Sequence, residues 1–180
     1  MDSKIKQQHT TLKTLLLLAA CSLFLTLSCC KSNEWVDWKV KNELWLENNK
    51  NQPGVKISST GLQYRIIADP TPEDARPNKT STIICDYTLK LINGYVIEDA
   101  RNAQLSLAST IPGFQEGCHK IHCNGDIELF IPASLGYDNN AYTTGDMSKA
   151  EGSGTEGTSS YIPPHSTLIF KIHIGGVSGD

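Results

Sequence analysis

The chain has 180 residues; 39% of them are hydrophobic, 19% are charged, and the formal net charge is -3 at pH 7. This length accommodates one ordinary domain of about 100–150 residues with extensions, and not two comfortable ones. The composition is that of a globular protein. Because there is no excess of positive charge to attract phosphates, nucleic-acid binding is not expected.

Residues 1–29 have the layout of a secretory signal segment. The stretch MDSKIKQQHTTLK supplies three lysines, and TLLLLAACSLFLTLS then runs apolar for about fifteen residues, which is short for a membrane span. The run ends in LSCC, which resembles a bacterial lipobox and makes Cys29 or Cys30 the expected site of lipidation. Two alternatives stay open: a match that ends at Cys21 but leaves apolar residues behind it, and an uncleaved anchor helix.

Residues 30–57 are expected to form a helix and a linker. The stretch 31–52 contains neither Gly nor Pro, and on a helical wheel it separates two stripes. The tryptophan stripe can dock on the main domain or on a second copy of the chain, so a homodimer through residues 33–47 is one expectation. The members of the two stripes are Trp35, Trp38 and Trp45, and Val36, Val40 and Leu44.

From Leu62 onward the apolar period changes to two, which indicates strands. LQYRII at 62–67 is the first of them. Asn93-Gly94 predicts a two-residue hairpin turn between TIICDYTLKL at 82–91 and the returning strand YVIED at 95–99. These elements predict an antiparallel sheet with one buried face. In the second strand that face carries Ile83, Cys85, Tyr87, Leu89 and Leu91.

One short helix is predicted after the hairpin, because Pro112 suits a helix start and Asn124-Gly125 suits a stop. Two further strands follow, DIELFIP at 126–132 and STLIFKIHI at 166–174, and residues 138–160 between them read as a long loop. A sheet, a single helix and more sheet predict an α+β fold class, with the helix lying across one face of the sheet.

The segment CHKIHC at 118–123 raises the question of a metal site. On a helix over residues 112–122, Cys118 falls on the apolar stripe that meets the sheet. His119 and Cys123 then point about 100° and 140° away from Cys118. The four side chains therefore do not converge on one tetrahedral ion. We expect neither a metal nor a cofactor.

Two alternatives for this segment stay open. His119, His122 and Cys123 can form a partial metal site, and CHKIHC together with His165 or His173 would suit a metal chaperone. In an oxidising compartment Cys85, on the inward face of its strand, is the plausible disulfide partner of Cys118. The simplest interpretation is a buried cysteine that behaves as a small apolar residue.

Five stretches of the chain resemble, in sequence and in order, the motifs of one known family. They are GVKISSTGLQYRII at 54–67, DYTLKLINGYVIED at 86–99, IPGFQEG at 111–117, IELFIPASLGY at 127–137 and YIPPHSTLIFKIHI at 161–174. Together they resemble the FKBP-type peptidyl-prolyl cis-trans isomerases, in their secreted or lipid-anchored bacterial branch. The resemblance implies an antiparallel half-barrel sheet of five or six strands wrapped on one short helix. It places that domain at residues 58–176.

The resemblance also implies an apolar, aromatic pocket for a proline ring. In such a site Phe114 would form the floor, while the Ile111 N–H and the Tyr137 hydroxyl would hold substrate carbonyls. The implied catalytic residues are Tyr137, Glu98 and Ile111. The implied substrate-binding residues are Tyr87, Ile97, Phe114, Tyr161, Ile162 and Phe170.

The implied function is isomerisation of X-Pro bonds in unfolded or exported polypeptides, by a lipid-tethered protein of the bacterial periplasm or cell surface. Two features depart from the family pattern. Ile97-Glu98 stands where Phe followed by Asp is usual, and the loop over residues 138–160 is longer than usual. They motivate an alternative: a non-catalytic module of the same fold that binds clients as a chaperone or scaffold.

Overall fold

The computed structural model describes residues 34–70, 74–143 and 161–178. Residues 37–180 form one compact unit. The predicted signal segment 1–29, with Cys29 and Cys30, lies outside the described residues. Within the described ranges no helix has the length and apolar character needed to cross a bilayer.

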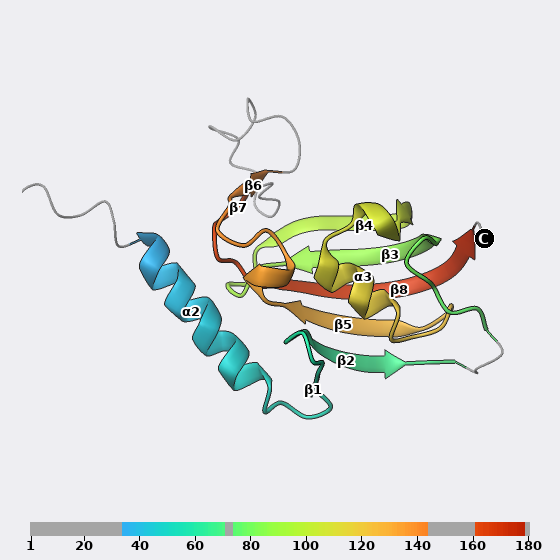
Figure 1. Ribbon diagram of the computed structural model, residues 1–180, viewed down its shortest axis with the longest axis horizontal. Coiled ribbons are helices and arrows are strands. Elements are labelled where there is room, and N and C mark those ends of the chain that lie inside the picture. Colours follow the sequence, from blue (N-terminus) through green and yellow to red (C-terminus); the bar gives the residue numbers. More distant parts are fainter. Residues whose placement is uncertain (1–33, 71–73, 144–160, 179–180) are drawn as a thin grey trace, which may run out of the picture. The chain divides into compact units, whose positions relative to one another are not determined.

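The elements follow one another in the order that Figure 1 labels. The helices are α2 (Glu34–Asn49) and α3 (Pro112–Cys118), and two short 3₁₀ turns are η1 (Leu107–Ser109) and η2 (Ala133–Leu135). The strands are β1 (Lys56–Ile57), β2 (Gln63–Ala68), β3 (Thr82–Lys90), β4 (Val96–Ser106), β5 (Asp126–Ile131), β6 (Tyr142–Thr143), β7 (Tyr161–Ile162) and β8 (Leu168–Ser178).

Six of the strands form one antiparallel sheet in the order β1-β2-β5-β8-β3-β4. β8 lies inside the sheet, where it pairs with β5 on one side and with β3 on the other. α3 crosses one face of this sheet (Figure 1). The predicted fold class, an α+β antiparallel sheet wrapped on one short helix, is confirmed.

The predicted buried faces of β3 and β8 are confirmed. Alternate residues of each strand point toward α3 and are at most 8% exposed, while their neighbours are half-buried or exposed. Burial of a large aliphatic or aromatic side chain contributes about 1.5–3 kcal/mol, so these two strands supply much of the core. The buried residues are Ile83, Cys85, Tyr87 and Leu89 in β3, and Leu168, Phe170, Ile172 and Ile174 in β8.

α3 approaches β5 closely because two of its glycines face that strand. A Cβ on Gly113 would collide with the Ile131 side chain, and a Cβ on Gly117 would collide with Leu129. Without these atoms the helix backbone packs directly against the strand's side chains. Cys118 is 0% exposed, so its predicted inward direction is confirmed.

The helix is shorter than the predicted span of 112–122. α3 ends at Cys118, and His119 is its C-cap. The His122 N–H donates to the Asp69 carboxylate at 2.8 Å instead of a helix carbonyl, and Asn124 takes a left-handed φ of 63°. This competing acceptor, far away in the sequence, ends the helix one turn early.

The turn after β3 has three residues, and the predicted two-residue hairpin is wrong. The Leu91 N–H donates to the Tyr95 carbonyl at 2.9 Å, so Ile92, Asn93 and Gly94 form the loop. Gly94 has a φ of 87°. Asn93 stays outside the left-handed region and uses its side-chain oxygen to accept from the Tyr95 N–H at 3.1 Å. A single positive φ at the third loop residue selects the longer turn.

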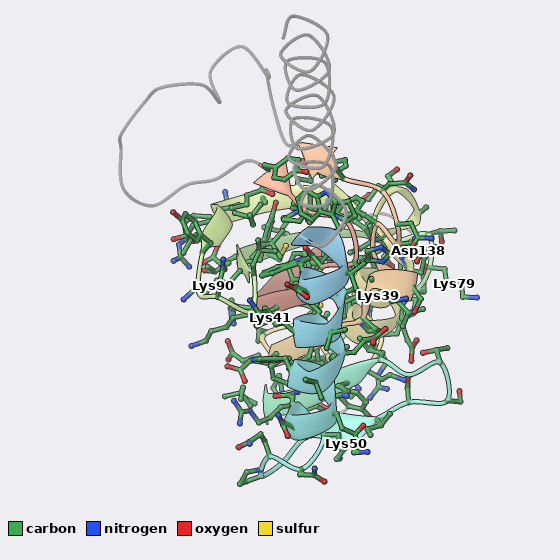
Figure 2. The ribbon with its side chains drawn as sticks, turned by 90° about the vertical axis from the view of Figure 1, so that its left-hand side faces the viewer. Lys39, Lys41, Lys50, Lys79, Lys90 and Asp138 are labelled. Carbon is green, nitrogen blue, oxygen red and sulfur yellow. The ribbon has the colours of Figure 1, made fainter. Side chains whose placement is uncertain are left out.

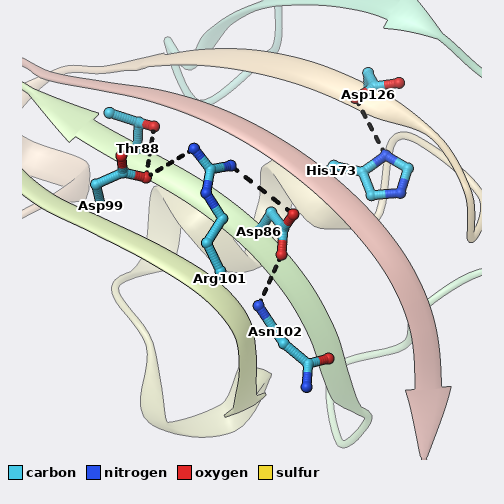
Figure 3. A network of polar contacts seen from close by, with 7 residues as sticks. All are labelled: Asp86, Thr88, Asp99, Arg101, Asn102, Asp126 and His173. Carbon is cyan, nitrogen blue, oxygen red and sulfur yellow. Dashed lines mark hydrogen bonds and ion pairs between the residues drawn. The ribbon is translucent and has the colours of Figure 1, made fainter.

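The solvent-facing side of the sheet carries a polar network (Figure 3). Asp86 lies at a bulge of β3 opposite β4, where it accepts from the Asn102 N–H at 2.7 Å and lies 3.8 Å from Arg101. Across the sheet the His173 ring lies 3.2 Å from the Asp126 carboxylate. Exposed pairs of this kind contribute at most about 1 kcal/mol each. The network therefore lies on the solvent-exposed face of the sheet, opposite the face that α3 covers.

Two tryptophans of α2 pack against the sheet domain. The Trp38 indole N–H donates to the Ser166 hydroxyl at 3.0 Å, and the Trp45 ring lies 5.8 Å from the Phe130 ring. Trp35 is 37% exposed. Of the two predicted alternatives for this stripe, docking on the main domain is the one observed for Trp38 and Trp45.

Buried amides fix the register of α2 on the domain. Asn42 is 2% exposed; its oxygen accepts from the Thr167 N–H at 2.7 Å, and its NH₂ donates to the Trp38 carbonyl at 2.8 Å. Asn49 donates to Gln63 at 2.9 Å, and both side chains are buried. Buried polar groups persist where they are bonded, so each contact permits one alignment of the helix.

A groove of about 220 Å³ remains between α2 and the segments that follow β5 and β7. Lys39 and Glu43 of α2 line one wall, and Asp138 and His165 of the following segments also line the groove. In Figure 2, which looks onto α2, Lys39 and Asp138 lie on the same side of the helix. The groove carries charges of both signs.

Replacement of Asn42 by Ala is expected to destabilise the protein by about 1–3 kcal/mol, because the buried Thr167 N–H loses its acceptor. Urea unfolding of the full chain measures this loss. Asn48→Ala, at an exposed position of the same helix, is the matched control and should change little. Equal stability of the two variants would show that α2 does not depend on this bond.

Candidate functional site

Three aromatic rings from three elements meet on the covered face of the sheet. Phe114 of α3 lies 5.1 Å from Phe170 of β8 and 6.2 Å from Tyr87 of β3, both in edge-to-face geometry. Tyr87 and Phe170 lie 6.1 Å apart. Such pairs contribute about 0.5–1.5 kcal/mol beyond their buried area. The structure thus brings three of the predicted substrate-binding residues into one cluster.

Glu98 joins this cluster through the Tyr87 hydroxyl, which donates to its carboxylate at 2.7 Å. The register of β3 and β4 shifts between Leu89 and Lys90, where Glu98 and then Val96 are the partners. This bulge lets Glu98 reach the covered face beside Ile97, since strict alternation would separate the two. Burial raises the pKa of Tyr87 above its ordinary range, and the Glu98 carboxylate adds to that shift.

Ile111 lies at the start of α3, next to the aromatic cluster. It is the N-cap, with an extended backbone, and Pro112 follows as the first helical residue. Its carbonyl accepts from the N–H groups of Phe114 and Gln115. Within the described parts of the chain its own N–H has no acceptor. The Ile111 N–H is thus available as a backbone donor, and its role in holding a substrate carbonyl stays a prediction.

Tyr137 follows η2 and is half-buried. Its ring is stacked on that of Tyr142, with centroids 4.0 Å apart and planes 8° from parallel. Burial raises the pKa of Tyr137 above its ordinary range; the charge of Tyr142, a hydrogen bond with it and the charge of Glu98 act in the same direction. The hydroxyl is therefore a neutral donor at physiological pH.

Sequence reasoning missed Tyr142, because it lies in the segment predicted as a long loop. The start of that segment pairs with its end: β6 and β7 form a two-stranded sheet, with Tyr142 opposite Ile162. The β-formers in AYTT and SSYI were the available signal. Residues 144–160 lie outside the described residues.

The remaining predicted substrate-binding residues occupy two kinds of environment. Ile97 is 4% exposed and Ile162 is 1% exposed, and both belong to the main core cluster. Tyr161 is 37% exposed, because successive residues of β7 point to opposite sides. A pocket role for Tyr161 stays a prediction.

In the segment CHKIHC, the His122 side chain makes structural contacts with two residues outside the segment. The His122 ring lies 2.9 Å from Asp69 on one side and 3.1 Å from the Arg76 guanidinium on the other. The His122 N–H and the Asp69 carboxylate form the hydrogen bond that chiefly lowers the pKa of Asp69. Among the described residues, no three His, Cys, Asp or Glu side chains gather with metal-binding geometry. His119 buries one ring nitrogen that has no hydrogen-bond partner within those residues.

Cys85 and Cys118 are free thiols, so the disulfide that remained an alternative is not formed in this structure. Both are buried, at 1% and 0% exposure. Burial raises the pKa of Cys85 to about 11, and burial likewise raises that of Cys118. Because the thiolate is the reactive form, neither is suited to nucleophilic catalysis.

A family model described as FKBP-type peptidyl-prolyl cis-trans isomerase matches residues 73–175, which contain every residue of the aromatic cluster. The chain belongs to this FKBP family. The match covers more than half of the sequence and includes Tyr87, Phe114, Tyr137 and Phe170.

Bacterial proteins are among its relatives. The outer membrane protein MIP of Legionella longbeachae is 32% identical over 140 residues, which is 76% of this chain and 52% of that protein. FkpA of Escherichia coli is 32% identical over 142 residues, or 77% of this chain and 46% of that protein. The chain thus spans about half the length of the curated relatives it matches.

Solved structures support the same FKBP fold. The crystal structure of FkpA from Escherichia coli covers 99% of this chain and 73% of its own, with a TM-score of 0.66 and 25% identity. A peptidyl-prolyl cis-trans isomerase from Pseudomonas syringae pv. tomato superposes with a TM-score of 0.62 at 21% identity, over 79% of this chain and 96% of that one.

Proposed function

We propose that this chain is a peptidyl-prolyl cis-trans isomerase that acts on X-Pro bonds of unfolded or exported polypeptides. The observation that carries the proposal is the aromatic cluster of Tyr87, Phe114 and Phe170, with ring centroids 5.1 to 6.2 Å apart. Membership of the FKBP family supports the same activity.

An apolar aromatic site suits this reaction. Rotation about an X-Pro bond faces a barrier of about 18–20 kcal/mol, because the planar amide is stabilised by resonance. A preorganised pocket that excludes water and favours the twisted amide lowers this barrier without a nucleophile. Each preference of about 1.4 kcal/mol for the twisted form accelerates the reaction tenfold.

The polar groups around the cluster then have separate roles. The Tyr137 hydroxyl and the Ile111 N–H are donors that hold substrate carbonyls in place. Glu98 accepts the Tyr87 hydroxyl, which keeps the Tyr87 ring in one orientation and partly neutralises the field of the carboxylate. Ile97, Ile162 and the exposed ring of Tyr161 complete the apolar wall.

A second function is favoured by one observation. Ile97 takes the place of an aromatic wall residue, and the cluster residues around it are at most 8% exposed. Without an aromatic ring at position 97 the site has one contact fewer with a twisted amide, which favours binding of proline-containing clients over turnover. The alternative is therefore a client-binding, chaperone-like or scaffolding module on the FKBP fold with little isomerase activity.

The full chain is expected to accelerate cis-to-trans isomerisation of a proline tetrapeptide. Tyr137→Phe removes a hydrogen-bond donor to the substrate and should lower kcat/KM about tenfold. Phe114→Leu removes the ring under the proline and should lower it further. Tyr95→Phe, at an exposed turn position, is the matched control.

Thermal unfolding monitored by circular dichroism checks that each variant is folded. A folded wild-type chain without isomerase activity would refute the enzyme proposal. Suppression of the aggregation of an unfolded protein by that same sample would then support the client-binding module.

We further propose that the protein is tethered by a lipid on Cys29 or Cys30 in the bacterial periplasm or at the cell surface. The apolar run that ends in LSCC supports this proposal, and a relative bears the name outer membrane protein MIP. Mass spectrometry of the mature N-terminus should find a diacylated cysteine at one of these positions. An unmodified chain that begins at Met1 would contradict it.

A homodimer through residues 33–47 is proposed from the apolar surface that α2 leaves uncovered. Val40 is 46% exposed and Leu44, one turn later, is 57% exposed, while Val36 is 56% exposed. Light scattering of the full chain in detergent should give the mass of a dimer, and Val40→Glu with Leu44→Glu should give a monomer. A monomeric wild type would exclude the dimer.

A further inference from the structure

The short β6–β7 sheet places one more aromatic residue at the site. Tyr142 pairs with Ile162, and Thr143 pairs with Tyr161, in antiparallel register. Ile162 is buried in the core at 1% exposure, so β7 is firmly seated and β6 takes its position from it. Tyr142 is thus held by backbone pairing.

The Tyr142 ring covers one face of the Tyr137 ring. The centroids lie 4.0 Å apart and the planes are 8° from parallel. The neighbouring ring blocks one side of Tyr137, so the side chain cannot swing that way about its Cα–Cβ bond, which is the rotation that would displace the hydroxyl. The direction of the Tyr137 hydroxyl therefore depends on Tyr142.

The backbone on both sides of Tyr137 is held as well. The N–H groups of Gly136 and Asp138 both donate to the Ala133 carbonyl, at 2.9 and 2.8 Å. Asp138 has a left-handed φ of 53°, and its carbonyl accepts from the His165 N–H at 2.8 Å. The backbone is fixed by these bonds, and the stack on Tyr142 together with the hydrogen bond between the two tyrosines holds the side chain.

We propose that Tyr142 is a positioning residue for the isomerase site: its stacked ring holds the Tyr137 hydroxyl in the direction that meets a substrate carbonyl. The inference rests on the proposed function, in which Tyr137 is the donor. A donor fixed before the substrate arrives stabilises the twisted amide without the cost of ordering a mobile ring. Tyr142 itself transfers no proton and needs no contact with the reacting bond.

A double-mutant cycle on the full chain tests this role. Tyr142→Ala should lower kcat/KM about fivefold, which corresponds to the loss of about one hydrogen bond. In a Tyr137→Phe background the same change should cost less than about twofold, because the hydroxyl that Tyr142 positions is already absent. Tyr142→Phe retains the ring and should restore most of the activity. Tyr95→Ala is the control for loss of an exposed tyrosine.

A second variant separates loss of the stack from loss of the β6–β7 pairing. Tyr142→Val keeps a strand-forming residue at that position but removes the stack, and it should match Tyr142→Ala in activity. A fivefold loss that persists unchanged in the Tyr137→Phe background would overturn the proposal, because Tyr142 would then act independently of that hydroxyl. Full activity of Tyr142→Ala would overturn it too.

Titration of tyrosinate absorbance provides a readout besides activity. Tyr142→Phe removes the second hydroxyl and keeps the stack, so Tyr137 should ionise at a lower pH than in the wild type while the activity is largely retained. Tyr142→Ala should lower the ionisation pH further as the ring becomes exposed. If the wild type proves inactive on peptides, the proposed function fails, and an unchanged titration of Tyr137 in Tyr142→Ala would overturn the stacking contact separately.

Discussion

The close approach of α3 to β5 is the constraint on which the site depends. Gly113 and Gly117 face Ile131 and Leu129 without a Cβ between them, so the helix lies directly on the strand. Phe114 lies between the two glycines in the sequence and is thereby pressed into the rings of Tyr87 and Phe170. Ile111, the N-cap of the same helix, packs against the core beside it. One packing contact thus sets the positions of Phe114 and Ile111, the residues proposed as the floor of the site and as its backbone donor.

α2 makes the segment behind the site part of the same packed unit. Trp38 and Asn42 bond to Ser166 and Thr167, which follow β7 and lead directly into β8. The segment that carries Ile162 is therefore held from two sides, by the core and by the helix. This arrangement explains why residues 37–180 form one compact unit, and it ties the geometry of the site to residues that precede the FKBP family match.

The elements that the sequence predicted well are those set by local alternation. The period of two in residues 82–91 and 166–174 predicted the buried faces of β3 and β8, since each side chain's direction follows from its neighbour's. The end of α3 was mispredicted because the Asp69 carboxylate that captures the His122 N–H is 53 residues away. Tyr142 was missed for a related reason: its position is set by pairing with a strand beyond the loop. The site residues came from family resemblance, because an inward ring on a strand looks the same in a core and in a pocket.

The β6–β7 pairing has a consequence for how this protein can vary. Because Thr143 and Tyr161 are register partners in two short strands, the two ends of the segment 144–160 are adjacent. Doubling the length of a flexible connection costs only about 0.6 kcal/mol of closure entropy once its ends are held together. The segment between them can therefore change in sequence, lengthen or be replaced by an affinity tag or a reporter domain. The β6–β7 pairing would still hold Tyr142 against Tyr137.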